Sequence, residues 1–166
     1  MTFTREKAKT PRVGGKTIAG LERLPNPVIR ELRDRQYACV YAIGPKEIGT
    51  PVKIGMAADI GKRFSDLQSG TYHELVIHHI VWTPGYPIAK NLERACHEIL
   101  TKAGKRLRGE WFDVTPEWAK RTINTMAQRP NMIVMSHEQV VEKAKAAVIK
   151  KYGKLNFGVG IRLPGW

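Results

Sequence analysis

Four polar residues between positions 41 and 93 have the side-chain types that phosphodiester hydrolysis requires, namely Tyr41, Lys53, Arg63 and Glu93. The reaction needs a group that activates water, a cation that holds the scissile phosphate and positive charge for the transition state. A phenol, a carboxylate that binds a metal ion and two basic side chains could divide these tasks. Taken singly, each also has an ordinary structural explanation, for example Tyr41 as a core residue with a satisfied hydroxyl.

An apolar hairpin is predicted to carry Tyr41 and Lys53. Residues 37–43 are apolar and end at Gly44-Pro45, and residues 52–56 follow after a short loop, which indicates two antiparallel strands. Because side chains alternate along a strand, Tyr41 and Lys53 share a face if the hairpin has the ordinary register. An ammonium close to the phenol oxygen would favour the phenolate, which gives one hypothesis for how Tyr41 acts as a base.

Two helices are predicted to carry Arg63 and Glu93. Asp59 can cap a first helix that ends before Gly70, and residues 88–103 show apolar side chains at helical spacing. Arg63 and Glu93 each sit next to a core position of their helix. Both side chains therefore flank an apolar stripe, where they can face a shallow cleft.

The order of predicted elements indicates an α+β fold. We expect a small central, mainly antiparallel three-stranded sheet flanked by helices, with N- and C-terminal extensions. The expected division is a basic flexible arm and short helix over 1–36, a nuclease-like domain over 37–128 and a C-terminal helical extension and tail over 129–166. The other predicted elements are a helix over 26–35, a strand over 74–82, a short strand or turn over 109–114, a helix over 116–128 and a helix ending near 152, capped by Ser136 and Gln139.

Two adjacent histidines, His78 and His79, fall inside the predicted strand over 74–82. Neighbouring residues of a regular strand point to opposite faces, so these two side chains cannot bind one metal ion together. We assign them no chemistry.

The joint order and spacing of these segments resemble the GIY-YIG nucleases over roughly residues 37–123. The resemblance is closest to the phage and bacterial branch that has Lys-Ile-Gly in place of Tyr-Ile-Gly. The matching segments are Cys39-Val40-Tyr41, Lys53-Ile54-Gly55, Gly61-Lys62-Arg63-Phe64, Leu92-Glu93-Arg94 with His97, and Gly109-Glu110-Trp111-Phe112.

This resemblance implies a DNA endonuclease with one Mg²⁺ or Mn²⁺ ion bound by Glu93. It further implies that a water is activated near Tyr41, that Lys53 belongs to the catalytic set and that Arg63 stabilises the transition state. Lys62 and His97 are candidate supporting residues. For His97, the two open roles are a helper in the metal shell and a brace for its helix. A single carboxylate is sufficient when waters and the substrate phosphate complete the shell.

The charge of the chain favours a polyanionic partner. Its 28 Lys and Arg against 15 Asp and Glu give a net charge of +13, spread along the sequence instead of clustered beside an apolar helix. We therefore expect DNA, in double-stranded form, and no membrane. Besides Lys62, the expected DNA contacts are the basic residues of the N-terminal arm, Arg5, Lys7, Lys9, Arg12 and Lys16.

Two functional hypotheses remain open from the sequence. The first is the metal-dependent endonuclease, and the second is a nucleic-acid-binding module that keeps the fold without cutting. No apolar leader and no apolar run of about 18 residues is present, so we expect a cytoplasmic protein of a bacterial or phage-infected cell.

Overall fold

The computed structural model of the protein describes residues 17–18, 21–22 and 24–153. The basic residues predicted in the N-terminal arm, from Arg5 to Lys16, lie outside this range. In chain order the elements are β1 (Thr17–Ile18), β2 (Leu21–Glu22), α1 (Asn26–Asp34), β3 (Ala38–Pro45), β4 (Val52–Ala57), α2 (Ile60–Ser69), β5 (Leu75–Thr83), α3 (Tyr86–Lys102), β6 (Arg106–Arg108), β7 (Trp111–Phe112), α4 (Pro116–Ala127), β8 (Met135–Ser136) and α5 (His137–Tyr152).

Three long strands form the centre of the sheet, because their apolar residues can be covered on both faces. β3 pairs with β4 on one side and with β5 on the other, and both pairings are antiparallel. All eight residues of β3 are buried. The predicted hairpin and the predicted strand over 74–82 are thus confirmed, and β3 is the central strand that positions its neighbours.

Within the described residues this sheet has six strands, so the expected three-stranded sheet is wrong, although the α+β class is confirmed. The strand order is β6-β7-β4-β3-β5-β8, and every neighbouring pair is antiparallel. The three additional strands have only two or three residues each. Such short segments show no alternating pattern in the sequence, because tertiary pairing and not local periodicity makes them strands.

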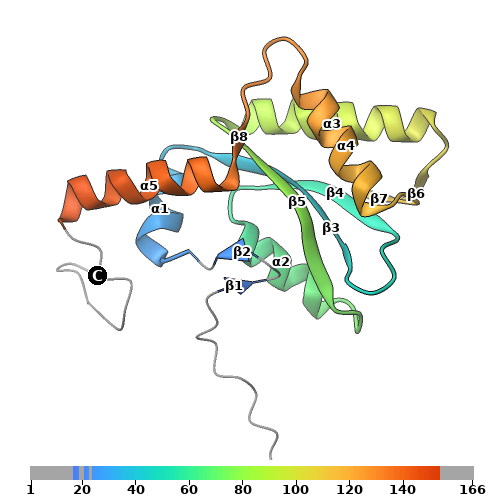
Figure 1. Cartoon of the computed structure of the whole chain (residues 1–166), viewed down its shortest axis with the longest axis horizontal. Helices are drawn as coiled ribbons and strands as arrows, with labels where there is room; N and C mark the ends of the chain where they lie inside the picture. Colours follow the sequence, from blue (N-terminus) through green and yellow to red (C-terminus); the bar gives the residue numbers. More distant parts are fainter. Residues whose placement is uncertain (1–16, 19–20, 23, 154–166) are drawn as a thin grey trace, which may run out of the picture.

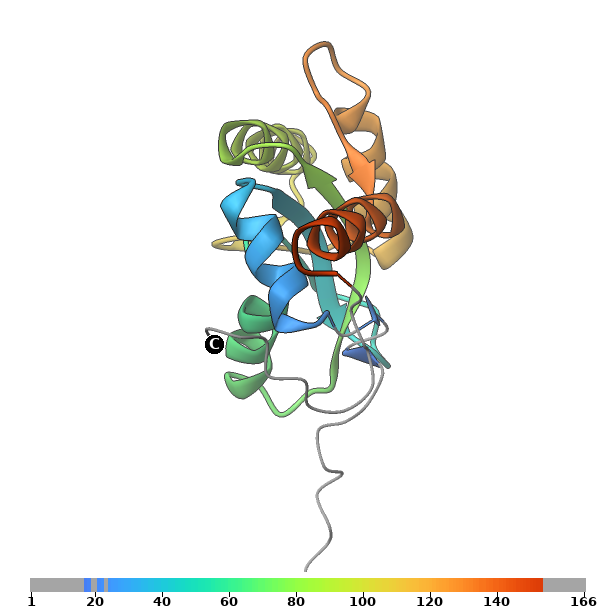
Figure 2. The same cartoon turned by 90° about the vertical axis from the view of Figure 1, so that its left-hand side faces the viewer.

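Helices cover both faces of the sheet, as Figures 1 and 2 show. α3 and α4 pack on one face, where Leu92 and Ile123 meet Val40 and Ile54. On the opposite face, α1, α2 and α5 pack against the side chains of β3 and β5 that point the other way. The central sheet is therefore buried between two layers of helices, and charged side chains can reach it only at its edges.

The caps of the helices follow the sequence closely. Asp59 accepts a hydrogen bond from the backbone of Lys62 at the start of α2, and Gly70 is the C-cap. Ser136 and Gln139 form the predicted capping box of α5. The helix predicted over 26–35 is α1, which begins at Asn26 with Pro25 as its N-cap.

A bulge interrupts β5 and shows that the alternation expected for its two histidines is wrong. Ala42 of β3 pairs with His79, but the next residue, Ile43, pairs with Ile77, which leaves His78 as the extra residue. His79 Nε2 lies 2.8 Å from Asn124 Oδ1 of α4. His78 Nε2 would be 3.2 Å from a Cβ built on Gly44, which faces the same layer. Both histidines therefore point toward the α3–α4 side.

Within the described residues, no helix is both long and apolar enough to cross a bilayer.

Candidate active site at the edge of strand β4

The edge of β4 is closed by two different parts of the chain. Of the residues of β4, only Val52 and Lys53 pair with β7. At the next residue, Ile54, the backbone N–H donates to the carbonyl of Glu110 at 3.1 Å, and the carbonyl accepts from Nε2 of His97 at 2.7 Å. The turn before β7 and one face of α3 therefore meet at Ile54.

Tyr41 reaches this edge by lying across a glycine. Its strand partner on β4 is Gly55, and a Cβ built on Gly55 would lie 2.5 Å from Tyr41 Oη and 2.8 Å from Cζ. No other residue type leaves room for the ring in this position. The Tyr41 side chain is consequently 1% exposed, with its hydroxyl directly over the backbone of β4.

Lys53 shares this face of the sheet with Tyr41, as the alternation predicted. Lys53 pairs with Ile43, which is two residues from Tyr41 on β3. Its ammonium donates a hydrogen bond to Oε2 of Glu110, and the side chains of Lys53 and Glu110 are 11% and 42% exposed. Lys53 is therefore a nearly buried cation whose charge is balanced by a carboxylate from the turn before β7.

The pKa of Glu110 lies below its ordinary value. Burial alone would raise this pKa, but the hydrogen bond and the charge of Lys53 more than offset the burial, with smaller contributions from His97 and Arg63. Glu110 is thus ionised at neutral pH, and its negative charge acts on the groups around it.

Glu93 on α3 is the second carboxylate of the site. Its pKa is raised to about 7, first by burial and then by the negative charge of Glu110 and a hydrogen bond with it, against the opposing charges of Lys53 and Lys90. Glu93 therefore carries the proton of this hydrogen-bonded pair and loses it near neutral pH, whereas Glu110 is ionised. Such a pair is unfavourable when both groups are ionised, unless a cation lies between or beside them.

Arg63 is exposed on α2, and its charge acts on two groups of the site. Burial raises the pKa of Tyr41 well above its ordinary value, and the charge of Arg63 is the effect that lowers it. The same arginine lowers the pKa of Glu110. Lys53 is bonded to Glu110 and is not among the charges that act on the pKa of Tyr41, so the hypothesis that Lys53 promotes a Tyr41 phenolate stays a prediction. Tyr41 is a neutral phenol, and its neighbouring cation is Arg63.

The two candidate supporting residues differ in their contacts. His97 donates to the Ile54 carbonyl, and its ring packs on Phe112 with centroids 5.1 Å apart. Burial lowers the pKa of His97, so the ring is neutral at pH 7. These contacts are those of a brace between α3 and β4. Lys62 is exposed in the first turn of α2, beside Arg63 in sequence but outside the carboxylate pair.

Glu110 is the site residue that sequence reasoning missed. It lies in the segment Gly109-Glu110-Trp111-Phe112, which in the sequence marks only the end of the resemblance. The available signal was a carboxylate directly before two aromatic residues that close the domain. Its importance depends on the pairing of β7 with β4, which two residues cannot reveal in a sequence.

The donor set suits a hard divalent cation. Within residues 24–153, no group of three or more His, Cys, Asp or Glu side chains could hold a metal ion. Mg²⁺ is commonly bound by one or two carboxylates, with waters and substrate phosphate completing an octahedral shell. Glu93 and Glu110 therefore provide a fitting pair of oxygen ligands, and a cation would relieve their mutual repulsion.

One protein family matches this chain. The T5orf172 domain matches residues 36–127, which is more than half of the sequence and includes every residue placed above at the edge of β4. The chain belongs to the T5orf172 domain family. This family is phage-associated and is linked to nuclease-like or DNA-binding functions. No curated protein and no solved structure is significantly similar to the chain.

Proposed function

We propose that this T5orf172-domain protein is a divalent-metal-dependent endonuclease that hydrolyses phosphodiester bonds in double-stranded DNA by a GIY-YIG-type mechanism with one metal ion. The observation that carries the proposal is the pairing of Glu93 with Glu110 beside Tyr41, Lys53 and Arg63. These groups come from separate parts of the chain. A purely structural site would not need to bring two carboxylates into contact at a half-buried edge.

Glu93 and Glu110 would hold the metal ion. When bound, Mg²⁺ or Mn²⁺ polarises the scissile phosphate and makes a coordinated water more acidic. Lys53 holds Glu110 in place through its ammonium and keeps this carboxylate ionised at neutral pH. His97 fixes α3 against the backbone of β4, and it thereby sets the position of Glu93 one turn earlier on the same helix.

Tyr41 would position the attacking water. Because burial keeps its phenol neutral, the hydroxyl can donate one hydrogen bond and accept another without carrying charge. Arg63 is exposed on α2 and adjoins Tyr41, so its guanidinium can reach a phosphate at the mouth of the site. Its charge would then stabilise the additional negative charge of the transition state. Lys62, which directly precedes Arg63 on α2, would contact the DNA backbone.

The decisive experiment is cleavage of a supercoiled plasmid by the purified protein with Mg²⁺, with Mn²⁺ or with EDTA. We expect nicked or linear products with either metal and none with EDTA. Glu93→Gln should abolish the products. Glu142→Gln is the matched control, because Glu142 is an exposed helical glutamate on α5, in the helix layer on the opposite face of the sheet from α3.

Two results would reject the nuclease. One is equal cutting by wild type and Glu93→Gln, which would indicate a contaminant. The other is metal-independent DNA binding without any cutting, which would favour the alternative of a non-catalytic binding module with this fold.

A further inference from the structure

A shallow groove of about 460 Å³ runs along the exposed face of α3 toward β6. Figure 1 shows β6 following directly from the C-terminal end of this helix. At one part of the groove lie Glu93 and His97, which belong to the candidate active site. The groove is therefore continuous with the site and leads away from it along the helix.

Four basic side chains line the groove, and they are Lys90, Arg94, Lys102 and Arg106. The first three lie at multiples of four residues on α3, so they form one stripe along its surface. Only two carboxylates, Glu93 and Glu98, line the same groove. The lining is thus positively charged overall.

None of these four cations forms an ion pair with a carboxylate in the described residues. In the part of the chain that the structure describes, the ion pairs involve other lysines and arginines. Arg94 donates to the neutral amide of Asn91 at 3.1 Å. Arg106 donates to the carbonyl of Gly109 at 2.8 Å, and its guanidinium lies 5.9 Å from the centre of the Phe112 ring. Two of the four charges are thus held in place without being neutralised.

The length of the stripe suits several nucleotides. From Lys90 to Lys102 the helix advances by twelve residues, which is about 18 Å. One strand of B-DNA advances about 3.4 Å per nucleotide along the duplex axis, so this length corresponds to about five nucleotides. An ordinary acidic peptide would not require a row of cations that runs past Glu93 of a nuclease-like site.

We propose that this α3–β6 groove binds the phosphate backbone of the DNA strand that is cut, on one side of the scissile phosphate. The inference rests on the proposed function for its assignment to the cut strand. The cations of the groove position the strand, and they leave the chemistry to the residues at the edge of β4. The groove would thus set which phosphate of the bound strand lies beside Glu93.

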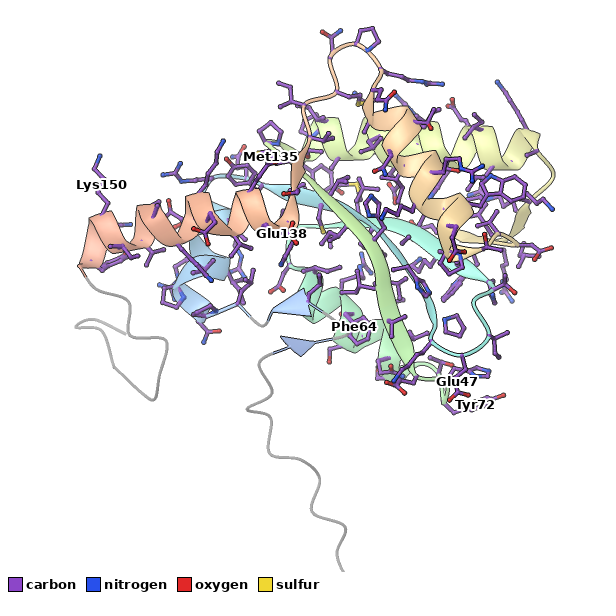
Figure 3. All side chains as sticks on the ribbon, in the orientation of Figure 1. Glu47, Phe64, Tyr72, Met135, Glu138 and Lys150 are labelled. Atoms are coloured by element: carbon purple, nitrogen blue, oxygen red, sulfur yellow. The ribbon has the colours of Figure 1, made fainter. Side chains whose placement is uncertain are left out.

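The test compares a groove variant with a control of equal charge. The groove variant is Arg94→Gln/Lys102→Gln, and the control is Lys143→Gln/Lys150→Gln, whose side chains are exposed on α5. Figure 3 shows Lys150 at the far end of α5, pointing away from the sheet. Binding to a fluorescent duplex is measured by anisotropy at several salt concentrations, with circular dichroism to verify folding.

Each lost phosphate contact lowers the slope of log K against log salt by about 0.9, so the groove variant should lose about 1.8. The control should keep the wild-type slope. An unchanged slope in the groove variant, or an equal loss in the control, would overturn the proposal.

A second measurement places the contact on the strand. Single phosphates on either side of the cleavage position are replaced by neutral methylphosphonates. We expect the substitutions to weaken binding of wild type on one side of the cut and to leave binding by the groove variant unchanged. Equal sensitivity of both proteins would overturn the assignment. If the wild type binds DNA without cutting it, the proposed function fails, while the salt slopes still decide whether the groove binds phosphates.

Discussion

Two clusters of half-buried titratable residues lie on the sheet, one at the edge of β4 and one at the bulge of β5. At the edge of β4, Lys53 pairs with Glu110, and Glu110 contacts Glu93. At the bulge, His79 bonds to the neutral Asn124, and burial lowers the pKa of both histidines. The first cluster keeps charges that oppose and repel one another, whereas the second is neutral at pH 7. A titratable residue in the sheet is therefore weak evidence of function, whereas a contact between two carboxyl groups, such as Glu93 and Glu110, is stronger evidence.

The two clusters should differ most in their effect on the rate of DNA cleavage. Removal of the Arg63 charge beside the β4 edge tests this. Arg63→Ala should lower the single-turnover rate of DNA cleavage by about 10²- to 10³-fold, the usual loss for one group that stabilises transition-state charge. The melting temperature should hardly change, because Arg63 is exposed. Wild-type cleavage by this variant would remove Arg63 from the site.

A second test concerns the packing that brings Tyr41 to the edge. Gly55→Ala should destabilise the protein by about 1–3 kcal/mol, because the new methyl group overlaps the Tyr41 ring. Urea unfolding measures the loss. Gly61→Ala is the matched control, since its Cβ would meet nothing nearer than Asp59 Oδ1 at 3.5 Å. In the background of Tyr41→Phe, which removes the nearest atom, the cost of Gly55→Ala should fall.

How far the sequence predicts this site depends on the length of the segments involved. Tyr41, Arg63 and Glu93 lie on long strands or helices, and the apolar periodicity and caps of these segments are readable in the sequence alone. Glu110 was missed because its position depends on β7, where only two residues pair with β4. The bulge at His78 was missed for a related reason, since strict alternation was assumed along β5.

A third, smaller effect concerns pH. Since the pKa of Glu93 is raised to about 7 in the folded protein, the folded state binds more protons than the unfolded state between the ordinary glutamate pKa and 7. The contribution of this group to stability is therefore fully present at low pH and is lost as the pH rises through 7. In EDTA, thermal unfolding of wild type should show this decline, and Glu93→Gln should flatten it.

That pH experiment has a clear failing outcome. Parallel stability curves for wild type and Glu93→Gln between pH 4 and 8 would mean that Glu93 titrates normally and is not in contact with Glu110.

The smallest effect should come from the bulge. His79→Ala removes one hydrogen bond to Asn124, so it should cost about 0.5–1.5 kcal/mol of stability. Under conditions where the variant is folded, its single-turnover cleavage rate should equal that of wild type. A loss of activity comparable to that of Arg63→Ala would show that the two clusters are not functionally distinct.

The hairpin that carries Glu110 also determines how easily the carboxylate pair can come apart. All three residues of β6 are exposed, and β7 is held to β4 by two residue pairs, whereas β3 is buried along its whole length. Phe112 of β7 is buried in the core, but residues 106–109 directly before Glu110 are exposed, and exposed segments open at a lower free energy than the core. Glu110 can therefore swing away from Glu93 while the sheet remains folded. On heating, DNA cleavage should disappear at a lower temperature than the far-ultraviolet circular dichroism signal of the helices and strands.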